Sequence, residues 1–283
     1  MSIEKITVIG AGTMGHGIAQ VSAQAGFHIT LVDVSRDIVA RAVTAVESNL
    51  RKGIERGKVT ESEMREALSR IQTSTDVAKS ASGADLVVEA IIERLDAKQE
   101  LFAKLDSVCK GEAILATNTS SLSIEKIASA TRRADRVIGM HFFNPVHIMK
   151  LLEVVIGPET SQATLTVVLD VAARIGKEAI TVKDAPGFAT SRLGLALGLE
   201  AMRMLEQGVA SAEDIDKAML LGYNHPMGPL RLTDLVGLDV RLSIAEYLFA
   251  ELGSEVFRPP DILRQKVTEG KLGKKSGEGF YKW

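Results

Sequence analysis

The sequence predicts an α/β protein in which a doubly wound sheet is followed by a smaller all-helical domain. Strand and helix patterns alternate over residues 3–182, and a glycine-rich turn joins the first strand to the first helix. Breaking residues cluster at 183–187, and the patterns beyond them are helical. Apolar strands that alternate with helices are typical of a parallel sheet covered on both faces. We therefore divide the chain into domains of residues 1–184 and 185–283.

The individual elements are predicted from the spacing of apolar residues. Strands are expected near residue 71 and over residues 3–9, 27–32, 85–90, 113–117, 136–140, 151–156 and 178–182. Helices of the first domain are expected over residues 16–25, 36–56, 61–68, 95–108, 124–128 and 162–174. Helical spacing in the second domain covers residues 188–206, 212–220, 231–236, 239–251 and 260–269.

The turn between the first strand and the first helix reads Gly-Ala-Gly-Thr-Met-Gly. Gly10 permits the tight turn, Gly12 lets the backbone approach a pyrophosphate, and Gly15 lets the helix pack closely on the strand. The unpaired N–H groups of the helix N-terminus stabilise the phosphate charge. Asp33, at the end of the second strand, is placed to bind the adenosine ribose and to repel a 2′-phosphate. The pattern predicts a Rossmann-like domain that prefers NAD. The alternative that Arg36 binds the 2′-phosphate of NADP stays open.

The composition narrows the possible classes of function. A hydrophobic content of 46% and a charged content of 25% are those of a globular protein, and the net charge of −2 gives no reason to bind nucleic acid or a membrane surface. No apolar stretch reaches the roughly 18 residues of a membrane span, and no targeting segment precedes the first strand, so we expect a cytoplasmic protein. Cys109, the single cysteine, is interpreted as a small buried hydrophobe. We expect no metal site.

A histidine and a glutamate are candidates for proton transfer. His141 follows the predicted strand at residues 136–140, and Glu153 comes twelve residues later in the next strand. Pro145 and His147 mark a turn between the two strands, so the two side chains are expected to face each other. An imidazole accepts a hydroxyl proton near neutral pH, and a buried carboxylate on its other nitrogen stabilises the imidazolium. A purely structural histidine is the alternative that the spacing leaves open.

The loop after the strand at 113–117 holds three serines. Ligands of open α/β sheets bind at the carboxyl ends of the strands, so Ser120 is a candidate to hydrogen-bond the reacting oxygen. Helix capping is the alternative, because a helix is predicted from residue 124. Capping is the better interpretation for Ser121 and Ser123, and both interpretations stay open for Ser120.

Six motifs lie along the chain: GAGTMG at 10–15, NTSSL at 118–122, HFFNPV at 141–146, APGF at 185–188, HPMGPLRLTDLVGLD at 225–239 and GKLGKKSGEGFY at 270–281. Together with Glu153 they resemble the 3-hydroxyacyl-CoA dehydrogenase family over essentially the full chain, and most of all its short monofunctional 3-hydroxybutyryl-CoA type. The resemblance implies an oxidoreductase that interconverts (3S)-3-hydroxybutyryl-CoA, or another 3-hydroxyacyl-CoA, and the 3-oxoacyl-CoA by hydride transfer to NAD.

The resemblance also implies roles for single residues. His141 matches the catalytic histidine, Glu153 its partner, and Ser120 the serine that contacts the substrate oxygen and the nicotinamide. Cofactor contacts are implied at Gly10, Gly12, Gly15, Asp33, Glu93, Lys98 and Asn144. Without the resemblance, Glu93 and Lys98 would be interpreted as solvated surface charges. Many family members have asparagine where this chain has Ser191, so a substrate contact at that position stays open.

Several alternatives remain. A dehydrogenase of the same architecture acting on a sugar acid such as L-gulonate, and a non-catalytic crystallin-like relative, are the rival functions. The cations within residues 51–58 either meet the phosphates of the acyl-CoA or form a solvated helix end. We expect a homodimer through the helical C-terminal domain, and fatty acid or butanoate metabolism as the setting.

Overall fold

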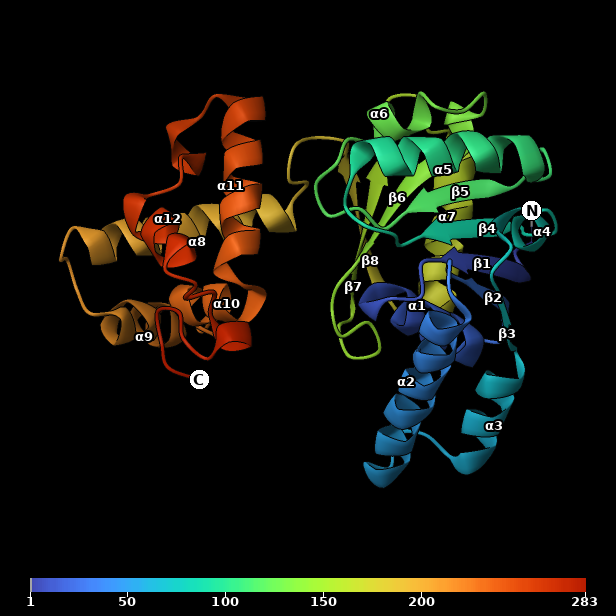
Figure 1. Cartoon of the computed structure of the whole chain (residues 1–283), viewed down its shortest axis with the longest axis horizontal. Helices are drawn as coiled ribbons and strands as arrows, with labels where there is room; N and C mark the ends of the chain where they lie inside the picture. The colour runs from blue at the N-terminus through green and yellow to red at the C-terminus, as the bar shows by residue number, and fades with distance from the viewer. Residues whose placement is uncertain (1) are drawn as a thin grey trace. The chain divides into compact units, whose positions relative to one another are not determined.

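The computed structural model describes residues 2–283, which form two compact units with the boundary between Ala185 and Pro186 (Figure 1). The strands of the first unit are β1 (Lys5–Ile9), β2 (His28–Val32), β3 (Ile71–Ser74), β4 (Leu86–Glu89), β5 (Ile114–Thr117), β6 (Val137–Phe142), β7 (Leu151–Ile156) and β8 (Glu178–Lys183). Its α-helices are α1 (Thr13–Gln24), α2 (Arg36–Glu55), α3 (Glu61–Ser69), α4 (Val77–Ala81), α5 (Leu95–Val108), α6 (Ile124–Ala128) and α7 (Gln162–Arg174).

The eight strands form one sheet in the order β3-β2-β1-β4-β5-β6-β7-β8. The order reverses between β1 and β4, as in doubly wound nucleotide-binding sheets, so the predicted Rossmann-like fold class is confirmed. Every neighbouring pair is parallel except β6 and β7, which are antiparallel. The expectation of a parallel sheet fails at this pair because residues 143–150 form a short turn, whereas a parallel pair needs a long crossover.

Helices cover both faces of the sheet. Alternate strand residues such as Val8 and Val88 join a core with residues of α1, α2, α3 and α7. The intervening residues project from the opposite face, because successive strand side chains alternate. On that face α5 packs against α4 and α6, and Figure 1 shows α5 and α6 above the sheet. Glu89, Thr117 and His141 belong to this second set, so three polar side chains share one face near the carboxyl ends of β4, β5 and β6.

One short helix was not predicted, and several predicted boundaries differ from the observed ones, among them the start of α1 at Thr13 rather than at residue 16. The helix α4 was not predicted, because it has only five residues; Asp76 caps it by accepting a hydrogen bond from Lys79 N. The strand β6 continues to Phe142, two residues beyond the predicted end, so His141 lies within the strand rather than after it. Helix α10 begins at Pro229, where proline is favoured at the first helical position.

The second unit is helical. It contains α8 (Thr190–Glu206), α9 (Ala212–Gly222), α10 (Pro229–Val236), α11 (Leu238–Leu252) and α12 (Asp261–Thr268), with short 3₁₀ turns between and after them. Its core gathers apolar residues from these helices around Leu199, Leu230 and Leu248, all fully buried. Within residues 2–283, no helix is long and apolar enough to cross a membrane.

Candidate functional site

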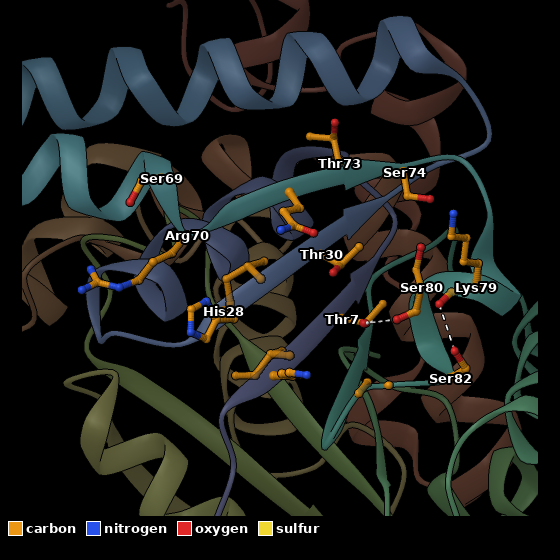
Figure 2. Close-up of a pocket in the computed structure, with 16 residues that line it drawn as sticks. Thr7, His28, Thr30, Ser69, Arg70, Thr73, Ser74, Lys79, Ser80 and Ser82 are labelled. Carbon is orange, nitrogen blue, oxygen red and sulfur yellow. Dashed lines mark hydrogen bonds between the residues drawn. The ribbon is translucent and has the colours of Figure 1, made fainter.

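A hollow of about 600 Å³ lies against β1, β2 and β3 (Figure 2). Thr7 and Thr30 of the strands and Ser80 of α4 line it, and Thr7 Oγ1 donates a hydrogen bond to Ser80 O at 2.9 Å. It extends to Lys5 and His28, the first residues of β1 and β2. Ligands of doubly wound sheets bind at the carboxyl ends of strands, and the predicted site residues do not line this hollow. We therefore place the candidate site at the opposite ends of the strands.

The glycine turn has the geometry that a dinucleotide requires. Gly10 has φ of +98°, and a Cβ there would lie 2.4 Å from Ala90 O, so only glycine fits. A Cβ on Gly15 would lie 1.7 Å from Gly10 O, which shows how closely α1 packs on the end of β1. A Cβ on Gly12 would meet no atom within 4 Å, and Gly12 gives α1 no side-chain cap. The N–H groups at the start of α1 are thus available to an anionic group.

Asp33 lies half-buried at the end of β2, beside this turn. Its Oδ2 accepts a hydrogen bond from Ala11 N at 2.7 Å, and its Oδ1 accepts one from Val34 N at 2.7 Å. An ionised carboxylate has about four acceptor positions, so the capacity for ribose hydroxyls remains. Asp33 therefore also holds the glycine turn in place, a contact that the sequence did not predict.

His141 and Glu153 meet across β6 and β7. They are direct partners in the antiparallel register, and His141 Nδ1 lies 2.7 Å from Glu153 Oε2. The histidine is 7% exposed and the glutamate 0%, so bulk water does not weaken this contact. The carboxylate accepts the proton of Nδ1, which makes Nε2 the basic nitrogen of the neutral ring. The Phe143 ring packs on the imidazole with 4.4 Å between ring centroids.

The loop after β5 lies next to these residues. Thr117 pairs with Gly139 in the parallel register of β5 and β6, so the loop runs beside the end of β6. Asn118 Oδ1 accepts a hydrogen bond from Phe142 N at 2.8 Å, which joins the loop to the residue after His141. Ser120 is half-buried on this loop. Ser123, not Ser120, caps α6 by accepting a hydrogen bond from Lys126 N.

Glu93 joins Ser120 to a buried lysine. Glu93 Oε1 accepts hydrogen bonds from Thr119 Oγ1 at 2.6 Å, from Ser120 N at 2.8 Å and from Ser120 Oγ at 3.1 Å. Its Oε2 lies 3.3 Å from Lys98 Nζ. Burial raises the pKa of Glu93, but the charge of Lys98 and the donors on Thr119 and Ser120 outweigh it, so this pKa lies below its usual value.

The interpretation of Lys98 as a solvated surface charge is wrong. Its side chain is 1% exposed, and its Nζ lies 2.6 Å from Glu89 Oε1. The Glu93 side chain is 39% exposed, so the surface-charge interpretation is partly correct for Glu93. Glu89 belongs to this group of polar contacts and was not predicted from the sequence. The available signal was a carboxylate at the end of an apolar strand, where an unpaired charge is costly.

The remaining predicted residues lie in the turn after β6, in the second unit and on other helices. Asn144 is exposed in the turn after β6. Ser191 is half-buried in the second unit, at the second residue of α8. Arg51, one of the cations within residues 51–58, forms an ion pair with Glu47 one helical turn earlier. Cys109 is buried, as predicted, and burial raises the pKa of its thiol to about 11. Within residues 2–283, no group of three or more His, Cys, Asp or Glu side chains is placed to hold a metal ion.

Comparison with known proteins identifies two matching domain families and relatives that match nearly the whole chain. Residues 5–185 match the 3-hydroxyacyl-CoA dehydrogenase NAD binding domain, and residues 187–283 match the 3-hydroxyacyl-CoA dehydrogenase C-terminal domain. The probable 3-hydroxybutyryl-CoA dehydrogenase of Bacillus subtilis (strain 168) is 47% identical over 281 residues, which cover 99% of this chain and 98% of that protein. The mitochondrial hydroxyacyl-coenzyme A dehydrogenase of Sus scrofa is 46% identical over 288 residues, covering 99% of this chain and 91% of the relative.

A solved structure agrees with these relatives. The (S)-3-hydroxybutyryl-CoA dehydrogenase of Ralstonia eutropha matches with a TM-score of 0.97 and 42% identity, covering 100% of this chain and 99% of that chain. The matched NAD binding domain assigns NAD as the cofactor. Three features of the site fit that dinucleotide: the N-terminus of α1, which has no side-chain cap, the open space beside Gly12, and the Asp33 carboxylate. The chain is therefore an NAD-dependent oxidoreductase, and it belongs to the 3-hydroxyacyl-CoA dehydrogenase family.

Proposed function

We propose that this enzyme interconverts (3S)-3-hydroxybutyryl-CoA and acetoacetyl-CoA, with other 3-hydroxyacyl-CoA thioesters as further substrates. The observation that carries the proposal is the buried contact of 2.7 Å between His141 Nδ1 and Glu153 Oε2 at the carboxyl end of β6. The names of the Bacillus subtilis and Ralstonia eutropha relatives support the acyl-CoA substrate over the sugar-acid and crystallin-like alternatives.

His141 performs the proton transfer in this proposal. Its Nε2 accepts the proton of the C3 hydroxyl in the oxidation and returns it to the forming alkoxide in the reduction. Glu153 holds Nδ1–H, which keeps Nε2 basic and stabilises the positive charge that the ring gains. Bound NAD supplies the acceptor for the hydride that leaves C3.

Ser120 orients the substrate oxygen. Its backbone N–H is fixed by Glu93, and the Asn118 amide ties the same loop to Phe142 N. The loop is thereby held at its start and at Ser120 itself, which places the serine hydroxyl on a rigid support. Gly12 and the N-terminus of α1 bind the pyrophosphate, and Asp33 binds the ribose. Glu93, Lys98 and Asn144 complete the cofactor contacts, and Ser191 contributes a substrate contact from the helical unit.

The wider setting is part of the same proposal. We place the enzyme in the cytoplasm, in fatty acid or butanoate metabolism. The domain of residues 1–184 binds NAD, and the domain of residues 185–283 contributes to the substrate site and to a homodimer. Acyl-CoA is the small-molecule partner, and neither nucleic acid nor a membrane is needed for the reaction.

A coupled absorbance assay tests the proposal. Acetoacetyl-CoA and longer 3-oxoacyl-CoA thioesters are each offered with NADH and with NADPH, and L-gulonate is offered with NAD. We expect NADH oxidation with acetoacetyl-CoA and a clear preference for NADH over NADPH. Turnover of L-gulonate without turnover of any CoA thioester refutes the proposed substrate, and failure to turn over either class supports the non-catalytic alternative.

A further inference from the structure

The strongest unassigned feature is a buried glutamate at the end of β4. Glu89 is 0% exposed, and three hydrogen bonds reach its carboxylate. Its Oε1 accepts from Lys98 Nζ at 2.6 Å and from Ile91 N at 2.7 Å, and its Oε2 accepts from Thr117 Oγ1 at 2.6 Å. A buried carboxylate is stable only when it is paired and hydrogen-bonded in this way. Glu89 is thus a fixed negative charge inside the first unit.

This charge anchors Lys98. The ammonium group lies 2.6 Å from buried Glu89 and 3.3 Å from Glu93, whose side chain is 39% exposed. The contact with Glu89 is shorter and is shielded from water, so it is the stronger of the two. The position of Lys98 is therefore set by Glu89, and Lys98 in turn sets the position of Glu93.

Glu93 carries the same constraint to Ser120. Its other oxygen receives the backbone N–H and the hydroxyl of Ser120, together with the hydroxyl of Thr119. Thr119 N also approaches Thr117 Oγ1 at 3.3 Å, and Thr117 donates to Glu89. Two routes of polar contacts thus connect Glu89 to the loop that holds Ser120.

Glu89 also supports the wall of the glycine turn. It accepts the N–H of Ile91, which fixes the turn that follows β4. Ala90, within that turn, donates to Ile9 O at 2.7 Å, and its carbonyl oxygen is the atom nearest to a Cβ on Gly10. The turn is therefore packed directly against the first glycine of the dinucleotide motif.

We infer that Glu89 is a positioning residue of the enzyme, which fixes the Lys98–Glu93 pair and the Ser120 loop on one side and the glycine turn on the other. This inference rests on the proposed function, because that function places Lys98, Glu93 and Ser120 at the cofactor and substrate. The residue acts through these groups and does not itself touch the reacting atoms.

The test is Glu89→Gln, which removes the charge and keeps the shape. The amide oxygen still accepts from Lys98 and Ile91, and the amide NH₂ meets Thr117 Oγ1, a hydroxyl that is able to accept. The matched control is Asp106→Asn. Asp106 is also a buried carboxylate, it lies on the same helix as Lys98, and it pairs with Arg132 and Arg133 rather than with the site.

We expect Glu89→Gln to lower kcat/KM for acetoacetyl-CoA with NADH by at least about tenfold, because small displacements of positioned groups cost up to about 100-fold. The dissociation constant of NADH, measured by fluorescence, rises in the same variant, and kcat falls at saturating substrate. Asp106→Asn lowers the melting temperature and leaves both kinetic quantities within twofold of wild type. A Glu89→Gln enzyme that loses only thermal stability, as the control does, overturns the inference.

A second variant keeps the test decisive if Glu89→Gln does not fold. Thr117→Val removes one donor to Glu89, while the charge of Glu89 and the volume of residue 117 are kept. We expect this variant to lower kcat/KM by about threefold or more. Unchanged kinetics in Thr117→Val overturn the inference. Wild-type turnover of acetoacetyl-CoA is measured first. Its absence refutes the proposed function, while the effect of Glu89→Gln on NADH binding still tests the role of Glu89.

Discussion

The substitution Glu153→Gln tests the proton-transfer pair most directly. The glutamate is fully buried and its Oε2 lies 2.7 Å from His141 Nδ1, so bulk water does not reach the carboxylate. A hydrogen bond to a charged group contributes about 1.5–3 kcal/mol. This bond strengthens when His141 takes up the substrate proton, because an imidazolium then faces the carboxylate. Its loss therefore raises the barrier more than it weakens binding. At about 1.4 kcal/mol per factor of ten, kcat falls by about 10- to 150-fold.

The assay is steady-state NADH oxidation with acetoacetyl-CoA, in which kcat and KM are separated. We expect a lower kcat, a KM within threefold of wild type and an unchanged affinity for NADH. Glu178→Gln is the control on the neighbouring strand β8, because its side chain is 78% exposed and forms an ion pair with exposed Lys150. A kcat for Glu153→Gln within twofold of wild type refutes the assigned role of the pair.

Four further predictions follow from the same geometry. His141→Gln lowers kcat by about 10²- to 10⁴-fold, the usual range for a general base, while NADH binding measured by fluorescence stays near wild type; a loss of binding equal to the loss of rate contradicts the assignment. Gly15→Ala lowers the melting temperature, because its Cβ would lie 1.7 Å from Gly10 O. Gly12→Ala keeps the wild-type melting temperature but loses NADH affinity, because its Cβ would meet no protein atom within 4 Å. Asp33→Asn lowers the preference for NADH over NADPH in kcat/KM, because the charge that repels a 2′-phosphate is removed; an unchanged ratio excludes this role. Cys109 has a thiol pKa of about 11, so only about one thiol in a thousand is ionised at pH 8, and alkylation by iodoacetamide is slow until the protein is unfolded; rapid alkylation of the native enzyme contradicts this.

Most of the fold was predictable from local patterns. Long segments such as α2, α5 and α7 have a clear period of apolar residues, and their predicted bounds agree with the structure to within a residue. The helix α4 was not predicted, because five residues are too few to show the helical spacing of apolar side chains. The antiparallel pair of β6 and β7 departs from the parallel expectation, because strand direction depends on the length of the connection rather than on the strands themselves.

The site was predictable to a different degree at each residue. The glycine turn and Asp33 follow from a local motif, and the contact between His141 and Glu153 follows from two strands joined by a turn. The burial of Lys98 was not predictable from its helix, because it depends on a partner in strand β4. Glu89 was missed for the same reason, since its partners Thr117 and Lys98 belong to another strand and to a helix and meet it only in the folded unit.

The pairing of β6 with β7 has a consequence for how the enzyme responds to ligands. His141 and Glu153 are opposite one another in a backbone ladder, so their separation is determined by strand hydrogen bonds within a single unit. The acid–base pair is pre-organised in the resting enzyme, and no binding energy is consumed in assembling it. Substrate and cofactor therefore arrive at a dyad that already exists, and the energy of holding the CoA portion remains available to orient C3 toward the hydride acceptor.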